Sequence, residues 1–439
     1  MERFRNILAG PIARGTVVSL VIRVAGIGLG VVQAIMTARL LGPDGYGAIA
    51  FVLSISMIVA TVVLAGTEML SVREVARYLA ERDFVGLRGF LRAIRIMLVG
   101  AVVLGVAAMA IVGANLTFAE EFRAVIIYSI VIFPMLALVL QFQGVLRGLG
   151  YTALSQIPFL FLRPLVLVGV LTYCFAFNIG IGPGGYLNTV VVAVVLSLIL
   201  AGWTALRLTP ATDTPPEVFP PARLIGLSAP FLAISVLGLL LAEINTLMLA
   251  WWTTPEETGL FQPIARIAPL MMLGTHAASM RYAPRVSELW ARGEVDRLDA
   301  VTQKYVRTTT AFTVAMIALI LLSGKWILGV FGEAFTVNIA ALWWVAAAQV
   351  VNVCFGPVWS LLTMTGFTTG VAISQGLGLA AHLVLGAILI PEYQGVGAAM
   401  AMAGGIIVWN FAMLIQVKRV LPFDPTLVGA LKKRGRGPE

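Results

Sequence analysis

The chain has 439 residues, of which 59% are hydrophobic and 12% are charged, and its formal charge is +9. Its mean hydropathy is +0.96. A soluble domain has roughly 45–50% apolar and about 25% charged residues, so this composition excludes a water-soluble enzyme. Because about 20 apolar residues are needed to cross a bilayer, the length leaves no room for a large soluble domain beside several spans.

Apolar runs of about 20 residues, bounded by charges, Gly or Pro, predict about twelve transmembrane helices. In the first half of the chain they lie near residues 15–41, 46–68, 92–113, 122–146, 151–177 and 184–206. In the second half they lie near residues 224–252, 258–282, 305–331, 336–364, 368–390 and 395–417. Both cysteines, Cys174 and Cys354, fall inside these runs and are interpreted as small core residues. The expected fold class is therefore an all-α membrane protein.

The distribution of Lys and Arg predicts the orientation of these helices, because short cytoplasmic loops collect basic residues. With the amino terminus inside, the inner segments hold 24 of the 30 basic residues and the outer segments hold 3. Both termini are therefore expected in the cytoplasm. The positive charge needs no nucleic acid as a partner, since the cytoplasmic face of a bilayer is anionic.

A Pro-rich polar stretch, LTPATDTPPEVFPP, lies at the midpoint of the helix count. We expect it to link two lobes. The predicted organisation is an N-lobe of six helices over residues 1–207, a cytoplasmic linker over 208–222, a C-lobe of six helices over 223–420, and a basic cytoplasmic tail over 421–439.

An internal repeat supports the division into two lobes. GPDGYG precedes a helix and a basic loop in the first half, as TPEETG does in the second, and Gly47 and Arg73 have their counterparts 212 positions later at Gly259 and Arg285. A second match, ALSQ with AISQ, is offset by 219 positions. Six helices per repeat is an even number, so the halves are expected to be parallel repeats related by an axis along the membrane normal.

Three motifs together resemble a known family over the whole chain. ARLLGPDGYG, at the end of the first helix, is similar to a signature of bacterial polysaccharide transporters, and IPEYQGVGAAMA is similar to their signature between the last two helices. The run GLFQPIARIAPLM followed by RVSEL resembles their eighth helix and the next loop. The chain is thus identified as similar to the polysaccharide transport branch of the multidrug, oligosaccharidyl-lipid and polysaccharide exporter superfamily.

This resemblance implies two helical lobes around a central cavity. It also implies a flippase that moves a polyprenyl-pyrophosphate-linked oligosaccharide from the inner to the outer leaflet of the bacterial cytoplasmic (inner) membrane by alternating access. We expect a multi-pass monomer surrounded by membrane lipids. Two alternatives from the same superfamily stay open, a cation-coupled multidrug exporter and a lipid II flippase. A membrane-embedded glycosyltransferase is disfavoured, because the predicted outer loops are short and offer no catalytic carboxylate pair.

Ionised side chains inside predicted helices are costly and normally face a cavity or a partner. Arg23, Arg163 and Arg266 lie about 12, 18 and 12 Å into helices one, five and eight, at 1.5 Å per residue. Guanidinium binds phosphate oxygens in a bidentate way, so these three arginines are the candidate pyrophosphate ligands. The resemblance favours Arg266 most, since lipid II flippases have an arginine in a similar context. The structural alternatives are that Arg23 extends to the inner headgroups and that Arg163 or Arg266 neutralises Glu243.

Glu243, the carboxylate predicted deepest in the bilayer, is the candidate residue for coupling to Na⁺ or H⁺. His276 and His382 are weaker candidates for polar residues of the cavity, because a lone histidine in an apolar helix is more often a buried donor than a ligand. No metal-ligand cluster, phosphate-binding loop or nucleophile triad is visible in the sequence, so no cofactor and no enzymatic activity are expected.

Overall fold

The structure is a computed structural model that describes the backbone of residues 11–115, 120–211, 214–215 and 217–434, and the side chains within these ranges except at 11–17, 20, 112–115, 120–126 and 433–434. Some of the basic residues counted for the predicted orientation lie outside the described side chains: Arg3, Arg5, Arg14, Arg123, Lys433, Arg434 and Arg436. The chain divides into two compact units, Met1–Leu240 and Leu241–Glu439. The predicted linker over residues 208–222 stays a prediction.

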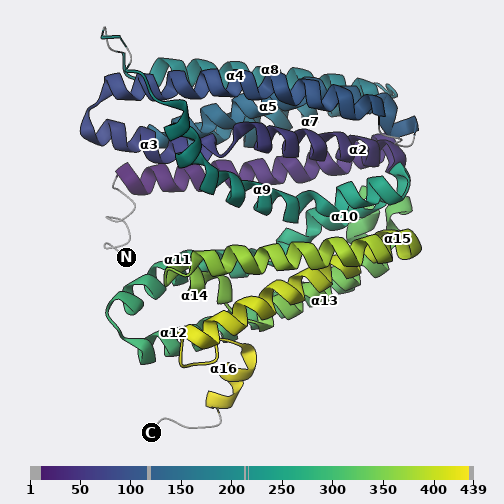
Figure 1. Cartoon of the computed structure of the whole chain (residues 1–439). Helices are drawn as coiled ribbons and strands as arrows, with labels where there is room; N and C mark the ends of the chain where they lie inside the picture. The colour runs from purple at the N-terminus through teal and green to yellow at the C-terminus, as the bar shows by residue number, and fades with distance from the viewer. Residues whose placement is uncertain (1–10, 116–119, 212–213, 216, 435–439) are drawn as a thin grey trace. The chain divides into compact units, whose positions relative to one another are not determined.

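The first unit consists of helices only within its described residues (Figure 1). Its elements are α2 (Pro11–Leu64), α3 (Thr67–Glu81), α4 (Phe84–Asn115), α5 (Glu120–Gly148), α6 (Thr152–Gln156), the π-helix η1 (Ile157–Leu162), α7 (Arg163–Ala176) and α8 (Pro183–Leu208). Helix α9 (Pro221–Trp252) begins in this unit and ends in the second.

The second unit is helical as well over the part of the chain that is described. It continues from α9 through α10 (Pro255–Met271), α11 (Leu273–Ala291), α12 (Val295–Phe331), the 3-10 helix η2 (Glu333–Asn338), α13 (Ile339–Cys354), α14 (Val358–Met364), α15 (Thr368–Val420) and α16 (Leu427–Arg434).

Nine helices among the described residues are long and apolar enough to cross a membrane. Two of them, α2 and α15, each contain a kink that separates two spans: α2 at Gly42, where φ is +66°, and α15 at Gln394, where φ is +50°. Together α10 and α11 occupy the place of the eighth span. These elements account for the twelve predicted spans, and the predicted all-α membrane fold is confirmed.

Two predicted spans are interrupted in the structure. The eighth, over 258–282, breaks at Met272, whose N–H donates to the Pro269 carbonyl at 3.2 Å between α10 and α11. The tenth, over 336–364, breaks between Cys354 and Val358, where Gly356 has a φ of +75° and Pro357 follows. Each break divides one apolar run into two shorter helices.

The order of elements repeats between the two units. Helix α3 follows a break at residues 65–66, and Arg82, whose φ is +57°, caps its end. Helix α11 follows a break at Met272 and is followed by Gly293, whose φ is +70°. A long helix then begins at Phe84 in one unit and at Val295 in the other. This correspondence agrees with the repeat that the sequence predicts.

Each unit has its own apolar core. In the first unit, Leu70, Leu87 and Phe90 pack where α3 and α4 meet the start of α9. In the second unit one cluster lies between α9, α10, α12, α13 and α15, and another lies between α11, α12, α14, α15 and the chain around α16. The clusters of the second unit hold α9, α10 and α15, which carry Glu243, Arg266 and His382.

Candidate functional site

Arg23 and Arg163 are located on neighbouring segments of the first unit. At Gly26 of α2 a Cβ atom would lie 2.5 Å from the carbonyl oxygen of Leu160 in η1, so the two backbones touch there. Gln156 donates a hydrogen bond to Ser19 nearer the predicted cytoplasmic end of the same pair. Arg23 lies one turn before Gly26 and Arg163 lies three residues after Leu160, so both belong to one packed pair of segments.

The surroundings of these two arginines differ. Arg23 is exposed on α2, whereas Arg163 is half-buried at the start of α7. The guanidinium carbon of Arg163 lies 5.1 Å from the centre of the Phe159 ring, a cation–π arrangement. Arg163 also follows directly on η1, and π-helical turns are frequent at functional sites.

A group of uncharged polar side chains lies on the same helix as Arg23, farther from the amino terminus. Tyr186 of α8 is buried, and its hydroxyl accepts hydrogen bonds from Gln33 at 2.8 Å and from Thr37 at 3.2 Å. The bonds join α2 to α8 inside the first unit.

In the second unit α9 and α10 form an antiparallel pair whose register is set by a buried hydrogen bond from the Gln262 amide to the Thr246 hydroxyl, 3.2 Å long. Thr254 caps α10, accepting a bond from the Glu257 N–H. One turn farther from this loop lie Glu243 on α9 and Arg266 on α10, at matching levels of the two helices. Neither side chain is without a partner, and Glu243 is half-buried while Arg266 is exposed.

The two histidines occupy different environments. His382 of α15 is only 3% exposed, and its Nε2 donates a hydrogen bond to Asn245 Oδ1 of α9 at 2.8 Å. His276 is exposed on α11, one turn after the break at Met272. The structure thus places His382, Asn245 and Glu243 around one stretch of α9.

Sequence reasoning missed the uncharged members of both sites, chiefly Gln33, Tyr186, Asn245 and Gln262. The sequence did carry a signal for the three amides, since amide side chains inside long apolar runs are costly unless they are hydrogen-bonded. The sequence did not say which partner each amide would meet. Over the described residues, no group of three or more His, Cys, Asp or Glu side chains is positioned to hold a metal ion.

The fold is similar to solved transporter structures. An inward-facing multidrug resistance MATE family transporter of the MOP superfamily matches with a TM-score of 0.68 and 15% identity, over 92% of this chain and 97% of that one. The lipid II flippase MurJ in an inward closed conformation matches with a TM-score of 0.70 and 12% identity, over 92% and 87%. A MOP superfamily transporter from Pyrococcus furiosus matches with a TM-score of 0.60 and 17% identity, over 98% and 97%.

A comparison with curated protein sequences finds no match. Residues 12–290, well over half of the chain, match the family described as polysaccharide biosynthesis protein. The match agrees with the resemblance carried by the sequence motifs, and the similar solved structures are transporters and a flippase rather than enzymes. The chain therefore belongs to the polysaccharide biosynthesis protein family, and it is a multi-pass membrane protein whose fold is similar to that of MOP superfamily transporters.

Proposed function

We propose that the protein moves a polyprenyl-pyrophosphate-linked oligosaccharide from the inner to the outer leaflet of the bacterial cytoplasmic membrane by alternating access, as a monomer. Membership of the polysaccharide biosynthesis protein family supports a glycan as the cargo. The likeness to a lipid II flippase supports a lipid-linked form of it.

The observation that carries the proposal is the excess of cations within the membrane-spanning helices. Arg23, Arg163 and Arg266 lie in such helices, whereas Glu243 is the one carboxylate the sequence places deep among them. The side chains of Arg23 and Arg266 are exposed on the surface of their helices. A planar guanidinium stays charged in poorly hydrated surroundings and binds phosphate oxygens in a bidentate way. An anionic headgroup is the cargo that such a lining favours.

Replacing the arginines one at a time tests this assignment. Each of Arg23→Ala, Arg163→Ala and Arg266→Ala is expected to weaken complementation of a flippase-deficient strain, while Arg→Lys at the same position restores it in part. The charge alone is retained by lysine, but the bidentate geometry is lost. Full complementation by all three alanine variants at wild-type expression would assign these arginines a structural role and remove the pyrophosphate site.

Glu243 is proposed to couple transport to Na⁺ or H⁺. Its place opposite Arg266 supports a cycle in which the carboxylate faces an arginine in one conformation and a cation or proton in the other. Glu243→Gln is expected to reduce transport and to flatten its dependence on pH and Na⁺. A variant that transports at the wild-type rate with unchanged dependence on both would leave Glu243 without a coupling role.

The second candidate function is a cation-coupled multidrug exporter, favoured by the likeness to MATE family transporters. It needs carboxylates that bind the coupling ion and a cavity suited to cationic drugs, whereas the charged side chains here are mainly arginines. Drug accumulation in cells that express the chain separates the two functions: the flippase leaves drug efflux unchanged.

A further inference from the structure

Helix α9 crosses the start of α3 at very short range in the first unit. At Gly66, where φ is +78°, a Cβ atom would lie 2.4 Å from the Leu232 nitrogen and 2.5 Å from the Ser228 oxygen. The Ser235 hydroxyl contacts the sulfur of Met69 at 3.5 Å just beyond the crossing. The crossing therefore fixes α9 against the chain where α2 ends and α3 begins.

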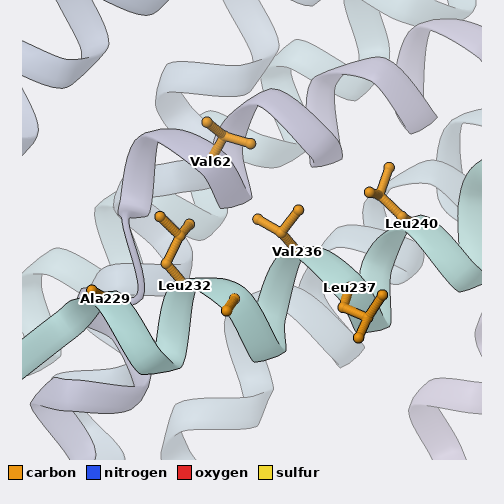
Figure 2. A pocket seen from close by; sticks show the side chains of 7 residues that line it. Val62, Ala229, Leu232, Val236, Leu237 and Leu240 are labelled. Carbon is orange, nitrogen blue, oxygen red and sulfur yellow. The ribbon is translucent and has the colours of Figure 1, made fainter. Parts of the chain in front are cut away.

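An apolar groove opens beside this crossing, between the end of α2 and α9. Its wall on α2 is Val62, one turn before the Gly66 crossing, and its wall on α9 is a stripe that runs from Ala229 to Leu240. Figure 2 shows Leu232, Val236 and Leu240 extending from α9 toward the side on which Val62 lies. All the lining side chains are hydrocarbon.

The groove follows α9 for about three helical turns. The stripe from Ala229 to Leu240 extends about 16 Å at 1.5 Å per residue, and the cavity volume is about 440 Å³. An isoprenoid chain that lies along this stripe would contact only hydrocarbon side chains.

One end of the groove is cationic. The Arg73 guanidinium lies 5.3 Å from the ring of Phe231, whose neighbour Leu232 lines the groove, and the Arg73 side chain is 50% exposed. Arg73 and Arg77 share the single carboxylate of Glu74, at 2.9 and 2.8 Å, so one positive charge remains in excess. This end lies in the loop region predicted to face the cytoplasm, where the headgroups of the inner leaflet are.

We propose that this groove binds the first isoprenoid units of the lipid-linked substrate, with the diphosphate at Arg73 and the chain along α9. The inference rests on the proposed function. It adds a second binding position for the lipid-linked substrate, separate from Arg23, Arg163 and Arg266. The apolar stripe supplies affinity for the chain, and Arg73 distinguishes a phosphorylated lipid from a neutral one.

Photolabelling of the purified full chain tests the site. The probe is farnesyl diphosphate carrying a diazirine, because it combines an isoprenoid chain with a diphosphate. Labelling is expected on the segments around Val62 and Ala233. Ala233→Trp, which places an indole in the groove, should reduce labelling at least tenfold, and Ala229→Trp should do the same.

The matched control is Ile234→Trp. Ile234 is next in the chain and 57% exposed, but it does not line the groove, so this variant should label like the wild type. Arg73→Gln should weaken competition by farnesyl diphosphate about tenfold and leave competition by farnesol unchanged. That difference identifies Arg73 as a phosphate ligand rather than a packing residue.

Three results would overturn the inference: labelling that is unaffected in both tryptophan variants, equal loss in the Ile234→Trp control, or competition by phosphatidylglycerol as strong as by farnesyl diphosphate. The last would make the groove a site for bulk anionic lipid. A failure of the proposed function looks different, because the wild-type chain would then fail to complement a flippase-deficient strain whatever the labelling shows.

Discussion

Gly66 is the residue on which the contact between α3 and α9 depends. Its φ of +78° is a left-handed conformation, and its Cα lies against the backbone of Ser228, Phe231 and Leu232. An alanine at this position would lower the free energy of unfolding by about 1–2 kcal/mol through the left-handed backbone. Overpacking of its Cβ against backbone atoms would lower it by about 1–3 kcal/mol more.

Gly66→Ala is therefore expected to destabilise the protein by roughly 2–5 kcal/mol on these two terms. The measurement is the fraction that stays monodisperse on a sizing column after a series of heating steps in detergent. Gly238→Ala is the control, since that glycine lies on α9 with nothing within 4 Å of an added Cβ. Equal heat resistance of the two variants would show that the crossing at Gly66 is looser than described.

At the same scale, the sequence located the charged candidates but not their partners. Arg163 and His382 stand out in apolar runs because their burial is costly. The contact between Arg163 and Phe159 is local, four residues apart in one helical stretch. That His382 would meet Asn245 from a helix 137 positions away depends instead on how distant helices pack. Hydropathy along one chain carries no such information.

At the scale of elements, the sequence predicted where helices lie better than how they are joined. The predicted turn at residues 42–47 corresponds to a kink at Gly42 inside one continuous element. The π-helix η1 and the break at Met272 were not expected, because both depend on the local hydrogen bonding around Pro158, Pro263 and Pro269 rather than on the apolar pattern.

The segment after α15 is tied to α12 by polar contacts outside the membrane spans. The Gln303 amide donates to the Asp424 carbonyl at 2.8 Å, and Arg307 Nε donates to the Ala430 carbonyl at 3.1 Å. Asp424 Oδ1 accepts from the Thr426 N–H, and Lys418 lies 3.5 Å from Oδ2. Partial burial alone would raise the pKa of Asp424, but the bonds from Thr426 and the charge of Lys418 hold it below its ordinary value.

Asp424→Asn is expected to lower stability at neutral pH by up to about 1 kcal/mol, a figure limited by solvent screening of an exposed pair. A carboxylate with a depressed pKa contributes its full stability above its unfolded pKa, and this contribution is lost as the pH falls through the folded pKa. The gap in thermal midpoint between wild type and variant should therefore close below about pH 4.

The control for this experiment is Glu392→Gln, which removes an exposed carboxylate at the other predicted side of the membrane. It should leave the midpoint unchanged at every pH. A gap between wild type and Asp424→Asn that stays constant from neutral to acidic pH would show that the effect comes from packing and not from the ionised carboxylate.

At the scale of the whole molecule, composition indicates a membrane protein, and the charge of the loops predicts a complete topology. Reporter fusions at residues 118, 255 and 392 are expected to read outside, and fusions at 85, 215, 295 and 435 are expected to read inside. The physical reason is the retention of Lys- and Arg-rich loops in the cytoplasm. An inverted reading at 215 or 295 would break the two-lobe arrangement, because both positions follow an even number of predicted spans.

What the sequence alone left open at this scale is the cargo. Family membership follows from motifs that extend along the chain, such as GPDGYG and IPEYQGVGAA, and the fold follows from the number and polarity of the helices. Selectivity for one glycan would depend on dispersed hydroxyl and amide groups such as those of Gln33 and Tyr186, whose roles no spacing rule identifies.

The central claim is that arginines within the membrane carry the diphosphate of a lipid-linked glycan across the bilayer. The most direct measurement is the appearance of a fluorescent polyprenyl-diphosphate oligosaccharide in the outer leaflet of liposomes containing the purified protein, read by quenching from outside. We predict transfer well above that of protein-free liposomes, and at least a tenfold lower rate for the combined variant Arg23→Ala, Arg163→Ala and Arg266→Ala. Equal rates for the wild type and this variant, or no transfer by either, would contradict the account.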